Sequence, residues 1–108
     1  MPAIHKELSQ GRWEKMTFGQ QMGNIASEIS RAKHWSVNGD KEQVQKSAER
    51  THELLSLTIA GEKRLSYLKE LTRLRVILAD AFIDAGQYDK SWQHLEDYCL
   101  SFLLADRQ

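Results

Sequence analysis

The clearest candidate for chemistry in this sequence is a Glu-x-x-His motif formed by Glu49 and His52. Helical bundle proteins use this spacing to hold a di-iron or di-manganese centre, which also needs a second such motif and two further carboxylates. At the other candidate places, Glu28 and Glu70, an arginine stands where the histidine should be. Glu49 also falls about 140° round the helix from Val44, toward solvent. We therefore predict a surface pair and no metal ligands.

Other catalytic patterns are absent from the sequence. The four histidines lie in different segments, and there is no Gly-x-Ser-x-Gly, phosphate loop or Cys-x-x-Cys. Cys99 falls among apolar residues, where a thiol packs as a small hydrophobic group and is a poor nucleophile. We predict no catalytic residue, no cofactor and no enzymatic activity.

Composition predicts a small cytoplasmic protein. The chain has 108 residues, and its 15 basic residues equal its 15 acidic ones in number. One cysteine cannot form an internal disulfide, which suits a reducing compartment. The first nine residues hold no apolar core typical of a signal peptide, and no apolar run approaches the roughly 18 residues that span a bilayer. We expect no association with membranes.

Basic residues concentrate between residues 63 and 75, which leaves a nucleic-acid role open as an alternative. Glu62 and Glu70 interrupt this run, however, and a net charge near zero provides no long-range attraction to phosphates. The balance of charges argues against nucleic acid as the main partner.

Local signals divide the chain into four helices. Thr17 with Gln20 forms a capping box, Asn38-Gly39 ends the first helix, and Asp40 caps a second that closes near Gly61. A third helix is expected from about 63 to 85, and a fourth is expected after Asp89. Short breaks that carry glycine favour antiparallel neighbours. The sequence predicts an all-α protein: a lead-in over 1–16, whose Trp13 docks on the helical body, and an antiparallel up-down four-helix bundle over 17–108.

The segment Leu65–Phe82 is expected to be the central helix. Its apolar residues spread over an arc of roughly 200°, which one neighbouring helix cannot cover. Arg75 falls inside this arc, and a buried guanidinium needs a carboxylate. Glu28 is the best-placed acid and Glu96 the second. The predicted pair of Arg75 and Glu28 either sets the helix register or lines a polar pocket or subunit interface.

Further apolar residues lie beside the main stripes, and long helices with a second apolar line favour a protein partner, most often a second copy. The predicted interface consists of Trp35, Leu57, Ile77, Tyr98, Leu100 and Leu104.

Three phrases, GNIASEISRA (23–32), SAERTHELLSLTI (47–59) and LKELTRLRVILAD (68–80), resemble a family of small uncharacterised bacterial helical proteins. That resemblance implies the helical fold and attaches no established activity to any residue. A weaker likeness, in size and topology, is to the ribosome-associated S23-like four-helix bundles.

The leading hypothesis is a non-enzymatic module that self-associates, as a homodimer first, and engages proteins through helix faces. An RNA- or DNA-associated accessory bundle is the alternative. A metal- or ligand-binding bundle is third.

Overall fold

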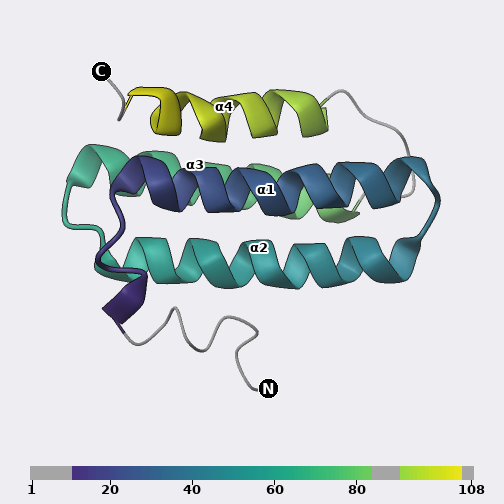
Figure 1. Ribbon diagram of the computed structural model, residues 1–108, viewed down its shortest axis with the longest axis horizontal. Coiled ribbons are helices and arrows are strands. Elements are labelled where there is room, and N and C mark those ends of the chain that lie inside the picture. Colours follow the sequence, from purple (N-terminus) through teal and green to yellow (C-terminus); the bar gives the residue numbers. More distant parts are fainter. Residues whose placement is uncertain (1–10, 84–90, 106–108) are drawn as a thin grey trace.

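A computed structural model describes residues 11–83 and 91–105 of the chain. Four helices make up most of this part: α1 (Phe18–Val37), α2 (Lys41–Gly61), α3 (Leu65–Ile83) and α4 (Ser91–Ala105). No strand occurs among the described residues, so the prediction of an all-helical chain is confirmed (Figure 1). None of these helices is long and apolar enough to cross a membrane.

The predicted cap at the start of α1 is present. The Thr17 hydroxyl accepts from the Gln20 amide at 3.1 Å, and the Gln20 side-chain oxygen accepts from the Thr17 amide at 2.9 Å. Gly39 follows the helix with a φ of +74°, a conformation in which a Cβ would be strained. The Asp40 carboxylate accepts from the Gln43 amide at 3.1 Å and begins α2. These local predictions are confirmed.

The third helix begins two residues later than expected, at Leu65. Glu62 explains the delay, because its carboxylate accepts from the amides of Lys63 and Arg64 at 3.1 and 2.9 Å. The Arg64 guanidinium also binds this carboxylate, with Nε and Nη2 at 2.8 and 3.0 Å from its two oxygens. These hydrogen bonds hold residues 62–64 in a turn, so α3 does not begin until Leu65. The predicted stop near 85 and the Asp89 cap lie outside the described residues.

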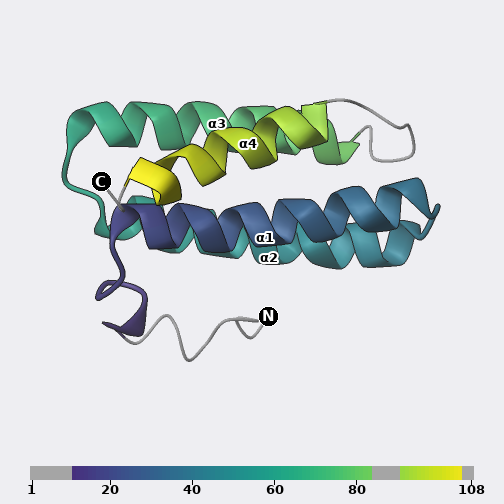
Figure 2. The same ribbon diagram turned by 45° about the horizontal axis from the view of Figure 1, so that its top comes forward.

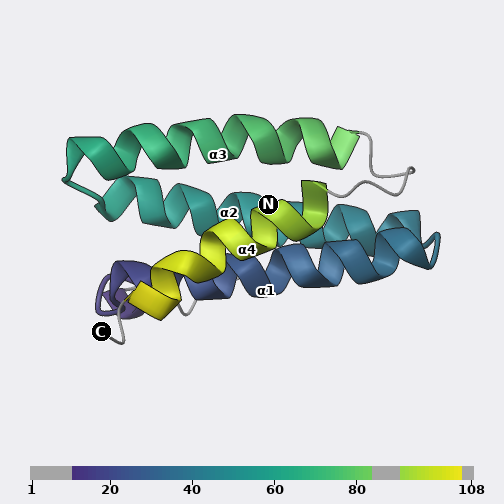
Figure 3. The same cartoon turned by 90° about the horizontal axis from the view of Figure 1, so that it is seen from above.

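The central helix is α1, and the expectation that Leu65–Phe82 would hold this place is wrong. The most extensive helix contacts join α1 to α4 and α1 to α2, whereas α3 touches α2 less and α4 least. Figure 2 shows α4 running obliquely between α3 and α1, with α2 behind α1, and Figure 3 shows α3 and α1 on opposite sides of α2. A Cβ at Gly23 would meet Leu103 Cδ2 at 3.0 Å, so the small residue permits the close approach of α1 and α4.

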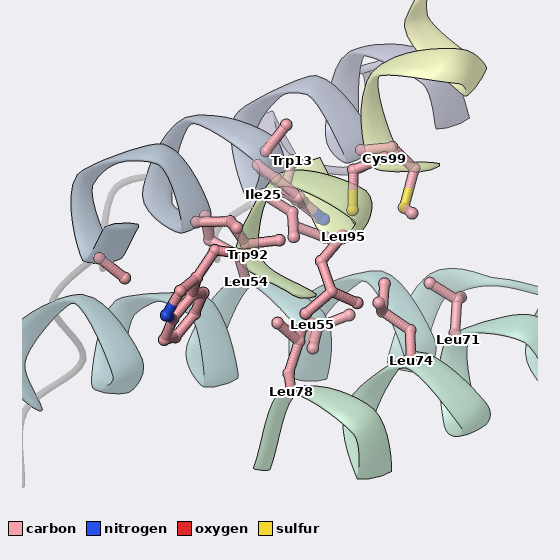
Figure 4. Close-up of a cluster of buried hydrophobic side chains, with 14 residues drawn as sticks. Trp13, Ile25, Leu54, Leu55, Leu71, Leu74, Leu78, Trp92, Leu95 and Cys99 are labelled. Carbon is pink, nitrogen blue, oxygen red and sulfur yellow. The ribbon is translucent and has the colours of Figure 1, made fainter. Parts of the chain in front are cut away.

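The core lies between the four helices and the end of the lead-in (Figure 4). Its members are Trp13, Met22, Ile25, Ala26, Ile29, Ala32, Leu54, Leu55, Leu71, Leu74, Leu78, Trp92, Leu95 and Cys99. Trp13 is fully buried, and its indole N–H donates to the Thr58 hydroxyl at 3.0 Å. The prediction that Trp13 docks on the helical body is confirmed, because the buried indole finds both apolar contacts and an acceptor.

Aromatic rings fill the space where α3 and α4 diverge. Phe18 stacks on Tyr67 with ring centroids 4.3 Å apart, and Phe102 meets Phe18 edge-on at 5.1 Å. The Arg64 guanidinium lies 4.0 Å from the centroid of the Tyr67 ring, a cation–π contact. Large rings replace direct contact between the two helix backbones here.

Candidate interaction surface

The side of α3 that faces away from the core is apolar along its midline. Leu65, Thr72 and Val76 share this side, because steps of 7 and 4 residues return to nearly the same bearing on a helix. Leu65 is 67% exposed and Val76 is 59% exposed. We define the outer face of α3 by seven residues: Leu65, Leu68, Lys69, Thr72, Val76, Ala79 and Asp80.

The outer face contains a shallow hollow of about 460 Å³. The Thr72 hydroxyl donates to the Leu68 carbonyl at 2.8 Å, so its hydrogen is used within the helix and its methyl group is left for contact. The walls are therefore apolar at the centre. The lining residues are Leu65, Leu68, Lys69, Thr72, Arg73 and Val76.

Charged side chains border this face. Lys69, Arg73, Arg75 and Asp80 are all exposed. None of the ion pairs found within residues 11–83 and 91–105 involves any of these four side chains. Charged groups of both signs thus stand beside an apolar midline, which is the usual anatomy of a polar rim around an interface core.

Arg75 is exposed, and the prediction that it would be buried is wrong. It lies beside the buried part of the arc, which is marked by Leu71 and Leu74, and its long side chain reaches water, so no buried carboxylate is needed. The arc itself is only partly covered, because Val76 and Ala79 also face solvent.

Glu28 is buried, with 3% of its surface exposed, but its partners are not the expected one. Arg31, one turn along α1, donates to one carboxylate oxygen. Arg50 of α2 places Nη1 3.8 Å from the other oxygen. Arg31 and Arg50 take the place predicted for Arg75, because Arg31 lies one turn from Glu28 on α1 and Arg50 lies on the neighbouring helix α2. Glu96, the second candidate, has Lys33 Nζ 3.5 Å from its carboxylate and joins α4 to α1.

The six residues of the predicted interface fall into two groups. Leu57, Tyr98 and Leu100 are partly buried and pack against the core, and Trp35 is also partly buried. Ile77 and Leu104 are exposed, to 43% and 59% respectively. Only these last two of the six have large apolar surfaces free for a partner.

Between α3 and α4 lies a groove of about 390 Å³, lined by Glu70, Arg73, Leu74, Ile77, Leu95 and Tyr98. The Tyr98 hydroxyl donates to the Glu70 carboxylate at 2.7 Å. Burial, and then this hydrogen bond to a carboxylate, raise the pKa of Tyr98 well above its usual value. A phenol that stays protonated, with its hydrogen already donated, serves as a wall of the groove and has no acid–base function at neutral pH.

The residues considered for chemistry are not brought together. His52 is exposed and Glu49 is half-buried on α2. Within the described residues, no group of three or more His, Cys, Asp or Glu side chains could hold a metal ion. Cys99 is buried, and burial raises the pKa of its thiol to about 12. A buried thiol with this pKa is unreactive at neutral pH.

The outer face of α3 was not predicted from the sequence as a separate feature. The apolar pattern places Val76 and Ala79 in one arc with the buried Leu71 and Leu74, and the spacing of Leu65, Thr72 and Val76 is the signal that would separate them.

Comparisons with models of known protein families, with curated proteins and with solved structures found no match to this chain. Its function is therefore inferred from the chemistry and geometry of the chain itself.

Proposed function

We propose that this protein is a non-enzymatic module that self-associates through the outer face of α3. The observation that carries the proposal is the exposure of Leu65 and Val76 on one line of a helix whose opposite side is buried in the core. Contact with a further neighbour would remove the apolar residues on the outer side of this helix from water. A second copy of the chain is the simplest such neighbour.

We also propose that the four helices form an antiparallel up-down bundle, which leaves α3 at a corner with one side free. Two observations support this arrangement. The connections from α1 to α2 and from α2 to α3 are each only three residues long. In Figure 1 the colour along successive helices changes in alternating directions.

Charge supports a second copy as the occupant. Lysine plus arginine equals aspartate plus glutamate, so two copies approach without long-range repulsion. The border of the outer face carries charges of both signs, and two of them, Lys69 and Asp80, lie on the same edge of the helix, which suits a self-complementary surface.

The expected association is moderate in strength. With 19 residues, α3 is roughly 28 Å long at about 1.5 Å per residue, so one helix face buries less than a standard interface of about 800 Å² per partner. We expect a dissociation constant on the order of 1–50 μM.

Light scattering on a concentration series tests the proposal. We expect the average mass to rise from that of one chain toward that of two between about 1 and 200 μM protein. A strictly monomeric protein over this range would overturn the proposal.

Two valines of nearly equal exposure give a matched pair of variants. Val76 is 59% exposed on the outer face, and Val37 is 61% exposed at the end of α1. Val76→Glu should abolish the rise in mass, because it buries a charge in the interface, while Val37→Glu should leave it unchanged. Leu104→Glu tests the alternative of an interface on α4. If this variant loses the dimer while Val76→Glu remains dimeric, the interface lies on α4.

A further inference from the structure

The outer face of α3 has an internal symmetry that specifies how two copies meet. We infer that α3 packs antiparallel against α3 of a second copy, about a twofold axis that crosses the outer face at the level of Leu74, so that Lys69 of each copy meets Asp80 of the other. This inference rests on the proposed self-association and adds the orientation, the register and the charged contacts of the dimer.

Sequence positions on either side of Leu74 match in chemical character. Thr72 and Val76 lie two residues before and two after it, and both belong to the apolar midline. Lys69 and Asp80 lie five before and six after, and they carry opposite charges. An antiparallel pair of identical helices brings together positions that are about equally far from the axis, and a difference of one residue shifts a contact by only about 1.5 Å. The Thr72 methyl group then meets Val76 of the second copy, and the ammonium group of Lys69 meets a carboxylate.

The edges of the face match as well. Residues 11 apart on a helix differ by about 20° in bearing, so Lys69 and Asp80 share one edge, while Leu68 and Ala79 share the other. A twofold axis perpendicular to both helices places each edge against the same edge of the second copy. One edge of the contact is then made of two ion pairs, and the other of apolar contacts. The central and charged side chains of the outer face, from Lys69 to Asp80, therefore have suitable partners.

A parallel arrangement of the two helices fails by charge. Its twofold axis would run along the helices and bring each edge of the face against the opposite edge, so Lys69 and Asp80 would meet the apolar edge of Leu68 and Ala79 and stay unpaired. Pairing within one chain fails by distance, because 11 residues of helix separate the two side chains by roughly 16 Å. Both groups are exposed, and neither takes part in an ion pair within the part of the chain that the structure describes.

The shape of the face agrees with this register. The hollow centred near Thr72 is open and has apolar walls, and the Val76 side chain of the second copy lies over it. Arg73 and Arg75 fall roughly 80° to either side of the midline and so lie at the border of the contact, where Arg73 also lines the hollow.

Charge-reversal variants of the full chain test the inference. Lys69→Glu places two acidic pairs at the contact, and Asp80→Lys places two basic pairs there. Each variant alone should dimerise at least about tenfold more weakly than the wild type, because two attractions become two repulsions. Light scattering and sedimentation velocity measure the masses.

An equimolar mixture of the two variants should recover wild-type affinity. In the mixed dimer, the glutamate introduced in one copy faces the lysine introduced in the other. At the second contact, the native Lys69 of one copy faces the native Asp80 of the other. Opposite charges therefore meet at both contacts, although neither variant can achieve this with itself.

The double variant K69E/D80K provides the internal control. It carries both substitutions but restores opposite charges within a homodimer, so it should dimerise like the wild type. A thermal melt of each variant checks folding, and exposed positions should keep the melting temperature within a few degrees.

The outcomes separate the two proposals. A monomeric wild type overturns the self-association itself. If the wild type is dimeric and both single charge-reversal variants dimerise as strongly as it does, self-association stands. The antiparallel pairing of α3 is then overturned. Weakening in each single variant with no recovery in either the mixture or the double variant also overturns the pairing of Lys69 with Asp80.

Discussion

The indole N–H of Trp13 donates to the hydroxyl of Thr58 at 3.0 Å, and both side chains are buried. The same hydroxyl donates to the Leu54 carbonyl at 2.8 Å, so Thr58 bonds its own helix and the lead-in at once. A side chain 45 positions away in the sequence is thus held against α2. The end of the lead-in is part of the core.

Trp13→Phe should lower the free energy of unfolding by about 1–3 kcal/mol, through the lost hydrogen bond and the smaller ring. Trp35→Phe is the matched control, because Trp35 is only partly buried and should cost less than about 1 kcal/mol. Urea denaturation measures both variants. Equal losses would show that burial of Trp13 contributes nothing particular to the fold.

Glu28 and Arg75 should respond to substitution in opposite ways. Glu28→Ala leaves Arg31 and Arg50 without their shared carboxylate and should cost about 1–3 kcal/mol. Arg75→Met should stay within about 0.5 kcal/mol, because its side chain is exposed. Melting temperatures of the two variants make the comparison. A large loss of stability in Arg75→Met would instead support the predicted structural ion pair.

Replacing glycine by alanine should change the free energy of unfolding in opposite directions at Gly39 and Gly61. Gly39 has a φ of +74°, so Gly39→Ala should destabilise by about 1 kcal/mol. Gly61 ends α2, and a Cβ there would meet only Glu14 Cγ at 4.0 Å. Gly61→Ala should therefore stabilise by about 0.4–1 kcal/mol, because alanine restricts the unfolded chain. Chemical denaturation of both variants checks the signs, and stabilisation by Gly39→Ala would be the contrary result.

Burial of Cys99 predicts a loss of stability in alkali. Burial raises the pKa of the Cys99 thiol from 9.0 to about 12 in the folded protein. Below pH 9 both states hold the proton and stability is unaffected, whereas above it the unfolded state releases the proton first. Stability should thus fall as pH rises from 9 toward 12.

Cys99→Ala isolates this effect from other alkaline titrations, including that of Tyr98. Between about pH 8 and about pH 10.5, the wild type should lose about 1–2 kcal/mol more than this variant. Urea denaturation at both values provides the measurement. Equal losses in the two proteins would show that the thiol ionises without unfolding.

The sequence by itself determined the helices and most of their ends. Thr17 and Asp40 bond amides three residues ahead, and Gly39 adopts a conformation that other residues resist. These causes act within one turn of the chain, so they can be read without knowledge of the fold. The one shift, at the start of α3, also has a local cause in Glu62, whose short-range hydrogen bonds the periodicity of apolar residues does not reveal.

Which side of each helix is covered depends on the packing of the four helices. Apolar residues occupy so wide an arc of α3 that periodicity alone cannot choose between Leu74, which is buried, and Val76, which is exposed. The choice depends on where α2 and α4 lie, and the same placement turns Arg75 to solvent and gives Glu28 the cations of α1 and α2. Burial is a property of neighbouring helices, and a single helix does not contain that information.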